Sequence, residues 1–166
     1  MKRRVALQVG QAALASLLLA GCGFKLRGSQ NFAFSSLAVE PSPGGPLAIE
    51  LRRSFGAAVK VLAPGAPLTQ AQVIVDILHE QREKIVVAVN SSGQVREFQL
   101  RIRLKFRART SQGEELVTAD EIVQQRDISF SESAVLAKEA EEALLYRDMQ
   151  TDIVRQLLRR LATVQL

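Results

Sequence analysis

The most regular pattern in the chain is a strict alternation of apolar and polar residues from Phe98 to Arg109. Apolar residues occupy every second position up to Ala108, and glutamine, arginine or lysine fills the positions between them. Successive side chains of a β-strand point to opposite faces of a sheet, so this alternation predicts a strand with one buried face. At about 3.3 Å per residue, the strand is roughly 40 Å long.

Two more long strands are predicted beside this one. Residues 73–89 are apolar at both ends but polar from His79 to Lys84. This indicates either one long strand with an irregular middle or two short strands. The segment Asn90-Ser-Ser-Gly93 has the composition of a hairpin turn. A second turn at residues 111–114 leads into a strand from Glu115 to about Phe130.

The first part of the predicted domain contains a short strand and a helix. Residues 34–40 have the composition of a strand, which the proline- and glycine-rich loop 41–46 ends. A helix is expected to begin at Pro46, because proline is favoured in a first helical turn, and to end near Gly56. Its apolar stripe consists of Leu47, Leu51 and Phe55.

A longer helix is predicted at the end of the chain. Residues 134–161 contain neither glycine nor proline, and their apolar positions recur at helical spacing. Either Ser131 or Ser133 is expected to cap the first turn of this helix. The apolar stripe consists of Ala143, Tyr146, Ile153, Val154, Leu157, Leu158 and Leu161.

The order of the predicted elements is β-α-β-β-β-α, which indicates an α+β fold. We expect a two-layer α/β sandwich, in which two helices pack on one face of a four-stranded, mostly antiparallel sheet. The other face of the sheet is left for solvent or a partner. A single domain is expected over residues 34–166, a length that allows it a hydrophobic core of its own.

The N-terminus has the pattern of an export signal. Three cations at positions 2–4 precede an interrupted apolar run that is too short for a membrane-spanning helix, and small residues follow. The order Leu-Ala-Gly-Cys resembles the lipobox of bacterial lipoproteins, which implies that residues 1–21 are removed and that Cys22 is acylated. Gly23 in the next position implies sorting to the outer membrane, with residues 22–33 as a lipidated tether.

Composition narrows the classes of function. Residues 1–21 carry three of the 22 cations and no acid, so cleavage lowers the net charge from +5 to +2. Nucleic acid is therefore not expected as a partner. One histidine and one cysteine in the whole chain argue against a zinc site or a histidine-based catalytic triad. Because the sequence also has no glycine-rich phosphate loop and no nucleophile elbow, we expect no enzymatic activity, no metal and no cofactor.

Five cations occupy alternate positions from Arg101 to Arg109 and therefore share one face of the predicted strand. Two interpretations are open. Acids on neighbouring strands, such as Glu115, Asp120 and Glu121, could pair with these cations across the sheet. Alternatively, the face meets anionic groups such as phosphates, which the planar guanidinium of arginine binds well.

Three stretches of the chain resemble the LPS-assembly lipoprotein family LptE. Cys22-Gly-Phe-Lys-Leu-Arg-Gly28 resembles the start of the mature family members, and residues 93–100 resemble their central hairpin. Residues 135–139, continuing through 146–149 to 159–161, resemble their last helix. This resemblance implies a non-enzymatic outer-membrane lipoprotein that plugs the β-barrel protein LptD in a 1:1 complex. It also implies that the protein assists barrel assembly and binds lipopolysaccharide (LPS).

The resemblance also points to residues for LPS contact. Lys138 is the first candidate, although it could instead pair with Glu142 on the helix surface. The hairpin tip, with Ser91 and Ser92, is the second candidate. Further positive charge is available from Arg96, Arg101, Arg103, Lys105 and Arg107. A different class of function stays open, namely a generic periplasmic lipoprotein that is auxiliary to an envelope or lipid exporter.

Overall fold

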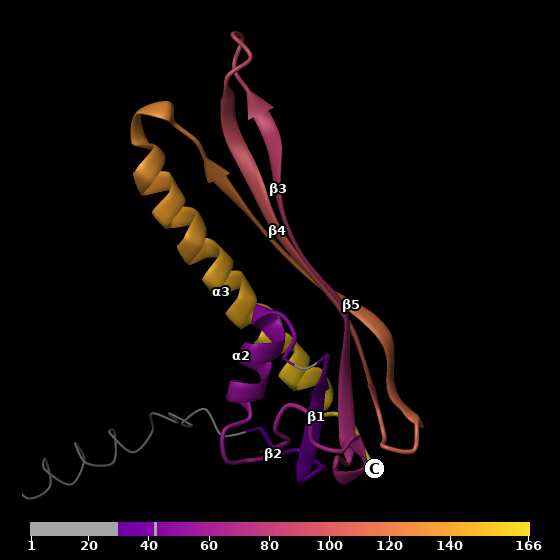
Figure 1. Ribbon diagram of the computed structural model, residues 1–166. Coiled ribbons are helices and arrows are strands. Elements are labelled where there is room, and N and C mark those ends of the chain that lie inside the picture. Colours follow the sequence, from indigo (N-terminus) through magenta and orange to yellow (C-terminus); the bar gives the residue numbers. More distant parts are fainter. Residues whose placement is uncertain (1–29, 42) are drawn as a thin grey trace, which may run out of the picture.

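The computed structural model describes residues 30–41 and 43–166, which form five strands and two α-helices (Figure 1). The predicted signal segment 1–21, Cys22 and most of the tether therefore lie outside the described residues. The elements are β1 (Ser36–Glu40), α2 (Pro46–Ser54), β2 (Lys60–Val61), β3 (Val73–Val89), β4 (Val95–Arg109), β5 (Glu115–Ser129) and α3 (Val135–Leu161).

The α+β fold is confirmed, but the sheet has five strands in the described residues rather than four. Its order is β2-β1-β3-β4-β5. The three long strands pair antiparallel, whereas β1 pairs in parallel with both β2 and β3. Strand β2 was not predicted because it is only two residues long, which is too short to show an alternation of apolar and polar residues. It forms where Lys60 and Val61 pair with Ser36 and Leu37 of β1.

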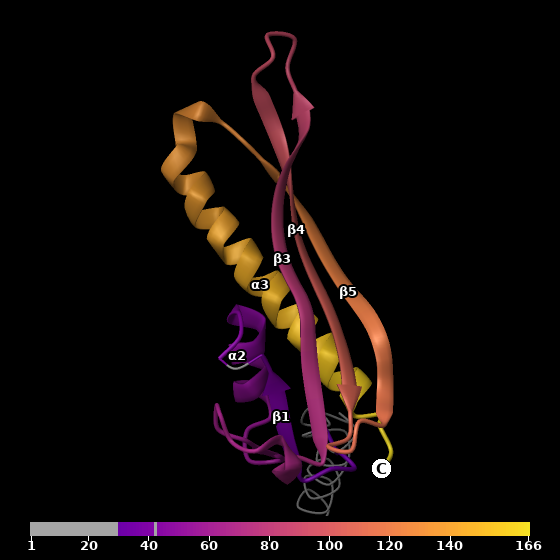
Figure 2. The same ribbon diagram turned by 45° about the vertical axis from the view of Figure 1, so that its right-hand side comes forward.

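Strand β3 is continuous, which confirms the interpretation as one long strand with an irregular middle. The irregularity is a shift in its register to β4 between Ile77 and His79, as in a β-bulge. The predicted turn closes the β3–β4 hairpin, with the Asn90 amide donating to the Gln94 carbonyl oxygen at 2.8 Å and Gly93 at a positive φ of 80°. The end of this hairpin extends beyond both β5 and α3 (Figures 1 and 2).

Both helices pack on the same face of the sheet, as predicted (Figure 2). The alternating apolar residues of β4 from Leu100 to Ala108 are fully buried on that face. They pack with Leu47 and Leu51 of α2 and with the C-terminal half of α3. Burial of this apolar surface is the main favourable contribution to folding, at about 25 cal/mol per Å².

The apolar stripe of α3 covers only part of the helix. It is buried from Met149 to Leu161, whereas Tyr146 is half-buried and Ala143 is exposed. The N-terminal half of α3 diverges from the long strands (Figure 1). The predicted stripe is therefore correct in its C-terminal half, whereas toward the N-terminus Tyr146 packs only at the edge of the core and Ala143 lies outside it.

The predicted serine cap of α3 is wrong. The residue that precedes the helix is Ala134, and no side chain caps the first turn. A short 3-10 turn, Glu132–Ala134, lies between the strand and the helix. The hydroxyl groups of Ser131 and Ser133 hydrogen bond to each other at 2.9 Å and do not reach the first-turn amides.

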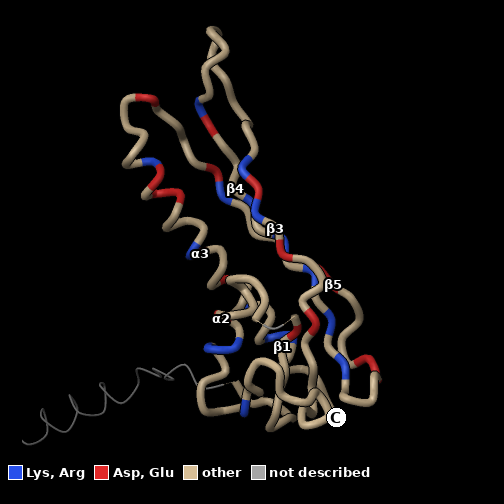
Figure 3. The backbone as a smooth tube through the Cα atoms, in the orientation of Figure 1, with Lys and Arg blue, Asp and Glu red and all other residues tan. Residues whose placement is uncertain are grey.

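The other face of the sheet is open along most of its length. At one end it is covered, because Ala38 of β1 and Ile74 of β3 pack against Leu62 and Ala71 from the segment between β2 and β3. Beyond this cover, the open face carries Asp76 and Glu83 of β3 and the alternating cations of β4 from Arg101 to Arg109. Figure 3 shows where charged residues lie along these strands. The prediction of a free face thus holds for all but this end.

Candidate binding site

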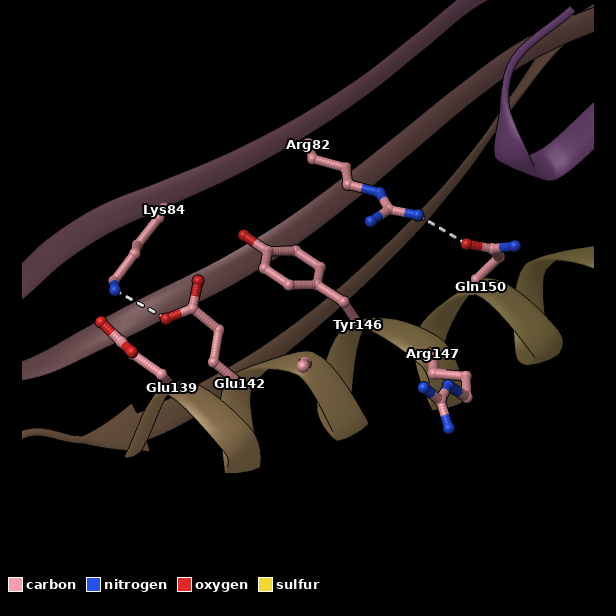
Figure 4. Close-up of a pocket in the computed structure, with 8 residues that line it drawn as sticks. Arg82, Lys84, Glu139, Glu142, Tyr146, Arg147 and Gln150 are labelled. Atoms are coloured by element: carbon pink, nitrogen blue, oxygen red, sulfur yellow. Dashed lines mark hydrogen bonds and ion pairs between the residues drawn. The ribbon is translucent and has the colours of Figure 1, made fainter. Parts of the chain in front are cut away.

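A polar groove of about 580 Å³ lies between β3 and the N-terminal half of α3 (Figure 4). Strand β3 contributes Arg82 and Lys84 to its walls. The side chains that α3 contributes are Glu139, Glu142, Ala143, Tyr146, Arg147 and Gln150.

The groove forms because the helix-facing side of β3 changes from apolar to charged along the strand. Val73 and Val75 are buried in the core, whereas Arg82 and Lys84 lie opposite the buried Ile102 and Leu100 of β4 and are themselves exposed. Charged groups cannot be covered by an apolar layer without a large desolvation cost. The polar stretch from His79 to Lys84 was the sequence signal for this site, but the sequence did not show that α3 lies opposite it.

Side chains of β3 and α3 bond across the groove (Figure 4). Lys84 Nζ lies 2.6 Å from Glu142 Oε2, and an Arg82 guanidinium nitrogen donates to Gln150 Oε1 at 2.5 Å. The Arg82 guanidinium also lies 5.5 Å from the centre of the Tyr146 ring, within cation–π range. These contacts hold the two walls of the groove at a fixed separation.

The Tyr146 hydroxyl supplies a further link between the two walls. It donates to the backbone carbonyl oxygen of Glu83 at 2.8 Å. Burial raises the pKa of Tyr146 above its usual value, and the nearby carboxylate of Glu142 adds to this effect. The hydroxyl therefore stays protonated at neutral pH and acts as a hydrogen-bond donor.

A smaller cavity of about 220 Å³ adjoins the groove at the start of α3. Its lining combines apolar side chains with two cations, Lys84 and Lys138, and two acids, Glu139 and Glu142. The Lys84 ammonium lies 4.4 Å from the centre of the Phe98 ring. The apolar side chains are Phe98, Ile128, Phe130 and Val135. Such a lining offers two ammonium groups beside an apolar wall, and each ammonium is paired with a carboxylate.

Lys138 is held at this cavity by two acceptors. Its ammonium donates to Ser129 Oγ and to Glu141 Oε2, each at 2.9 Å. The alternative pairing with Glu142 is wrong, because Glu142 is engaged by Lys84 of β3. The structure thus brings Lys138, a candidate from the sequence, together with Lys84, which the sequence did not single out.

The cations of β4 point to the open face and are largely paired with acids. Glu83 lies 3.4 Å from Arg101 and 3.6 Å from Arg103. The Nε atoms of Arg107 and Arg109 both lie 2.8 Å from Asp76 Oδ2. Pairing across the sheet, one of the two interpretations from the sequence, is therefore confirmed for these four cations.

The acids in these pairs come from β3, whereas the sequence pointed to acids of β5. Asp120 lies opposite Phe106, so it points to the helix-covered face, where it pairs with Arg160. Glu115 and Glu121 form no ion pair within residues 30–41 and 43–166. Strand register decides which carboxylates meet the arginines, and the sequence pattern did not show that register.

The remaining candidates lie apart from the groove. Lys105 and Arg96 are exposed and form no ion pair in the described part of the chain. Ser91 and Ser92 are exposed at the hairpin tip, where Asn90 Oδ1 accepts from the Ser92 amide at 3.0 Å. The tip lies beyond the N-terminal end of α3 (Figure 1).

The described residues contain no metal-binding cluster and no membrane-spanning helix. No group of three or more histidine, cysteine, aspartate or glutamate side chains is placed to hold a metal ion. Among the helices of residues 30–41 and 43–166, none is both long and apolar enough to cross a membrane.

A mixed sheet with both helices on one face, together with a polar groove and an adjoining, partly apolar cavity, defines a small α+β domain with a candidate binding site. The family model LptE, described as lipopolysaccharide-assembly, matches residues 33–161. The chain therefore belongs to the LptE family of lipopolysaccharide-assembly lipoproteins. The role of this family is non-enzymatic, which confirms the expectation that the protein is not an enzyme.

Two LptE proteins of other bacteria are similar to this chain over most of their own length. The chain is 29% identical over 157 residues to the LPS-assembly lipoprotein LptE of Photorhabdus laumondii, covering 91% of this chain and 82% of that protein. It is 28% identical over 155 residues to the LPS-assembly lipoprotein LptE of Pectobacterium atrosepticum, with the same coverage.

Solved structures share the fold. The solution structure of lipoprotein B from Nitrosomonas europaea has a TM-score of 0.69 and 35% identity, covering 82% of this chain and 88% of that chain. The crystal structure of rare lipoprotein B from Shewanella oneidensis has a TM-score of 0.63 at 20% identity, covering 78% of this chain and 95% of that chain. At this low sequence identity, the similarity to the Shewanella oneidensis structure shows a shared fold only.

Proposed function

We propose that this protein is an outer-membrane lipoprotein that plugs an LptD-like β-barrel in a 1:1 complex, assists assembly of the barrel and binds LPS during its insertion at the cell surface. Membership of the LptE family supports a role in LPS assembly. The observation that carries the LPS-binding part is the cavity in which Lys84 and Lys138 stand beside Phe98 and Ile128. LPS combines phosphates and acidic sugars with acyl chains, and it matches such a lining.

The character of the open sheet face supports the plug. Arg101, Arg103 and Arg107 are each beside an acid, so the face is polar without a large excess of charge. The lumen of an outer-membrane barrel is also polar, which suits a surface of this kind. In this proposal Cys22 carries the lipid anchor after removal of residues 1–21, and the domain faces the periplasm and occupies the barrel lumen.

We rank the candidate LPS contacts by the groups that surround each of them. Lys138 comes first because it lines the amphipathic cavity. Arg96 and Lys105 come next, since their charges are not offset by an ion pair in the described residues. Ser91 and Ser92 at the tip offer hydrogen bonds only. Arg101, Arg103 and Arg107 stay in the proposal as contacts that a phosphate could share with Glu83 or Asp76.

A detergent pull-down of the tagged, lipidated protein from its own membranes tests the proposal. We expect a large outer-membrane β-barrel to co-purify in about equal amount, because a plug buries much of its surface in its partner. Mass spectrometry of the eluate identifies the partner. Recovery of the lipoprotein alone, or with inner-membrane exporter subunits, would contradict the plug and favour the generic auxiliary lipoprotein.

Charge reversal at Lys138 tests the LPS contact. We expect Lys138→Glu to weaken binding of purified LPS about tenfold, which corresponds to roughly 1.4 kcal/mol, because a cation at the cavity becomes an anion that repels phosphate. The matched control is Lys60→Glu, which makes the same charge change on the exposed, two-residue strand β2. Fluorescence titration measures both variants, and circular dichroism checks that they fold. Equal affinities of the two variants would overturn the assignment of Lys138.

A further inference from the structure

The end of the β3–β4 hairpin is an uncharged arm. No charged residue occurs between Lys84 and Arg96. We call residues 85–95 the uncharged arm, and they lack the red and blue of charged residues in Figure 3. Charged residues make up 23% of the whole chain, so a stretch of this length without one is unusual on a solvated hairpin.

The arm exposes apolar side chains on both of its faces. The exposed fractions are 37% for Ile85, 48% for Val86, 48% for Val87 and 58% for Val89. Consecutive residues of a strand point to opposite faces, so neither face of the arm is covered. The first residues of the arm, Ile85–Ala88, lie level with the end of β5, because they pair with 97–99 of β4, which pair with 127–129 of β5. The tip of the arm projects past the end of β5 and past α3 in both ribbon views (Figures 1 and 2).

The outer edge of β3 is also unpaired along the arm. Strand β1 pairs with β3 only from Val73 to Asp76, and no other described strand pairs with that edge. Unpaired backbone amides and carbonyls on such an edge are a template for another strand, and proteins usually protect them with charges or proline. The opposite edge of the sheet, β5, carries such charges, namely Glu115, Asp120, Glu121, Arg126 and Asp127. The arm carries neither charges nor proline, and the only such protection in it is a shift in the register to β4 between Val86 and Val89.

The unpaired backbone decides what can cover the arm. Hydrocarbon would cover the valines but would leave the edge amides and carbonyls of β3 without partners, at a cost of several kcal/mol for each group. An extended polypeptide satisfies both the backbone groups and the apolar side chains. A partner strand is therefore the occupant that fits, and an uncharged strand with apolar residues at alternate positions fits best.

We infer that β3 accepts an extended strand of its barrel partner along Ile85–Val89, so that the partner adds a strand to this sheet. The identity of the partner rests on the proposed function, whereas the mode of contact rests on the edge itself. Backbone hydrogen bonds supply the affinity in this mode, and the alternating side chains supply the selectivity.

The test is amide hydrogen exchange on the intact, lipidated protein, free and in the complex purified from its own membranes. We expect amides of Ile85–Val89 to exchange about tenfold or more slowly in the complex, because strand addition places edge amides in hydrogen bonds. Val87→Lys places a charge on the edge and is expected to reduce barrel recovery about tenfold. The matched control, Leu144→Lys, alters an exposed leucine (56%) on α3, on the other side of the sheet from the open face, and is expected to leave recovery unchanged.

Each outcome separates the mode of contact from the proposed function. If the barrel co-purifies while exchange at Ile85–Val89 is unchanged, the inference is overturned and the plug stands. If no barrel co-purifies, the proposed function is contradicted, and the inference loses the partner that would supply the strand. Protection of the arm by LPS micelles in the absence of the barrel, or by concentration-dependent dimerisation, would identify another occupant and also overturn the inference.

Discussion

Replacement of Phe106 by alanine is expected to lower the free energy of unfolding by about 3–5 kcal/mol, the range measured for buried phenylalanine. Phe106 is fully buried on the helix-facing side of β4. Its ring packs in the core shared by the sheet and the helices, and the Arg160 guanidinium lies 5.8 Å from the ring centre. The substitution removes buried apolar surface and also leaves a cavity that rigid neighbouring strands cannot fill. The free-energy costs of these two changes add.

Urea denaturation followed by circular dichroism measures this loss. The control is Val123→Ala, because the exposed valine on β5 is expected to change stability by less than about 0.5 kcal/mol. A small domain has about 5–15 kcal/mol of stability in total, so Phe106→Ala is expected to bring the protein close to its unfolding limit. Similar midpoints for the two variants would contradict the position of the core.

Asp76→Asn is expected to destabilise the domain by about 1–2 kcal/mol, below the roughly 3–5 kcal/mol seen for fully buried pairs. The Asp76 carboxylate accepts hydrogen bonds from both Arg107 and Arg109, and its side chain is only 13% exposed. Asparagine cannot neutralise the two guanidinium groups, which then repel each other. The effect is reduced because the Arg107 side chain is 42% exposed to water.

The same carboxylate makes stability depend on pH. Burial by itself raises the pKa of Asp76, but the hydrogen bonds and charges of Arg109 and Arg107 outweigh burial and hold the pKa below its usual value. A group with a lowered pKa in the folded state stabilises the protein above its unfolded-state pKa of about 3.9. That contribution is lost as the pH falls through the folded-state pKa.

Unfolding free energies measured from pH 7 down to pH 2 test this dependence. We expect the difference between the wild-type protein and Asp76→Asn to be largest at neutral pH and to shrink in acid, where the wild-type carboxylate is protonated too. Glu114→Gln, at an exposed turn, is the control for a general effect of removing one negative charge. A difference that stays constant down to pH 2 would show that the ion pairs do not contribute as inferred.

These ion pairs also bear on the function of the cationic face. Asp76 and Glu83 each hold two arginines, so a phosphate that binds there competes with a carboxylate already in place. Lys138 is also paired, with Glu141, but its cavity offers in addition an apolar wall that an acyl chain could contact. This difference is the reason for placing Lys138 ahead of the β4 arginines as an LPS contact.

The sequence by itself determined the elements whose residues repeat regularly. The alternation from Phe98 to Arg109 predicted β4 and its buried face, and helical spacing predicted the C-terminal half of α3. Turn composition predicted the β3–β4 hairpin. The resemblance at Cys22 and in the last helix pointed to the family that the comparison over residues 33–161 shows. Each of these features is local, because side-chain period and turn chemistry depend on a few neighbouring residues.

The tertiary structure alone decided which distant residues meet. The register of β3 against β4 placed Asp76 and Glu83 beside the arginines, and the register of β5 against β4 turned Asp120 to the helix-covered face. Lys84 and Glu142 are 58 positions apart in the chain, yet they bond across the groove. A periodic pattern records the face of the sheet that a residue occupies, but not the residue opposite it. That choice follows from the packing of whole strands and helices, since only the assembled core sets register and separation together.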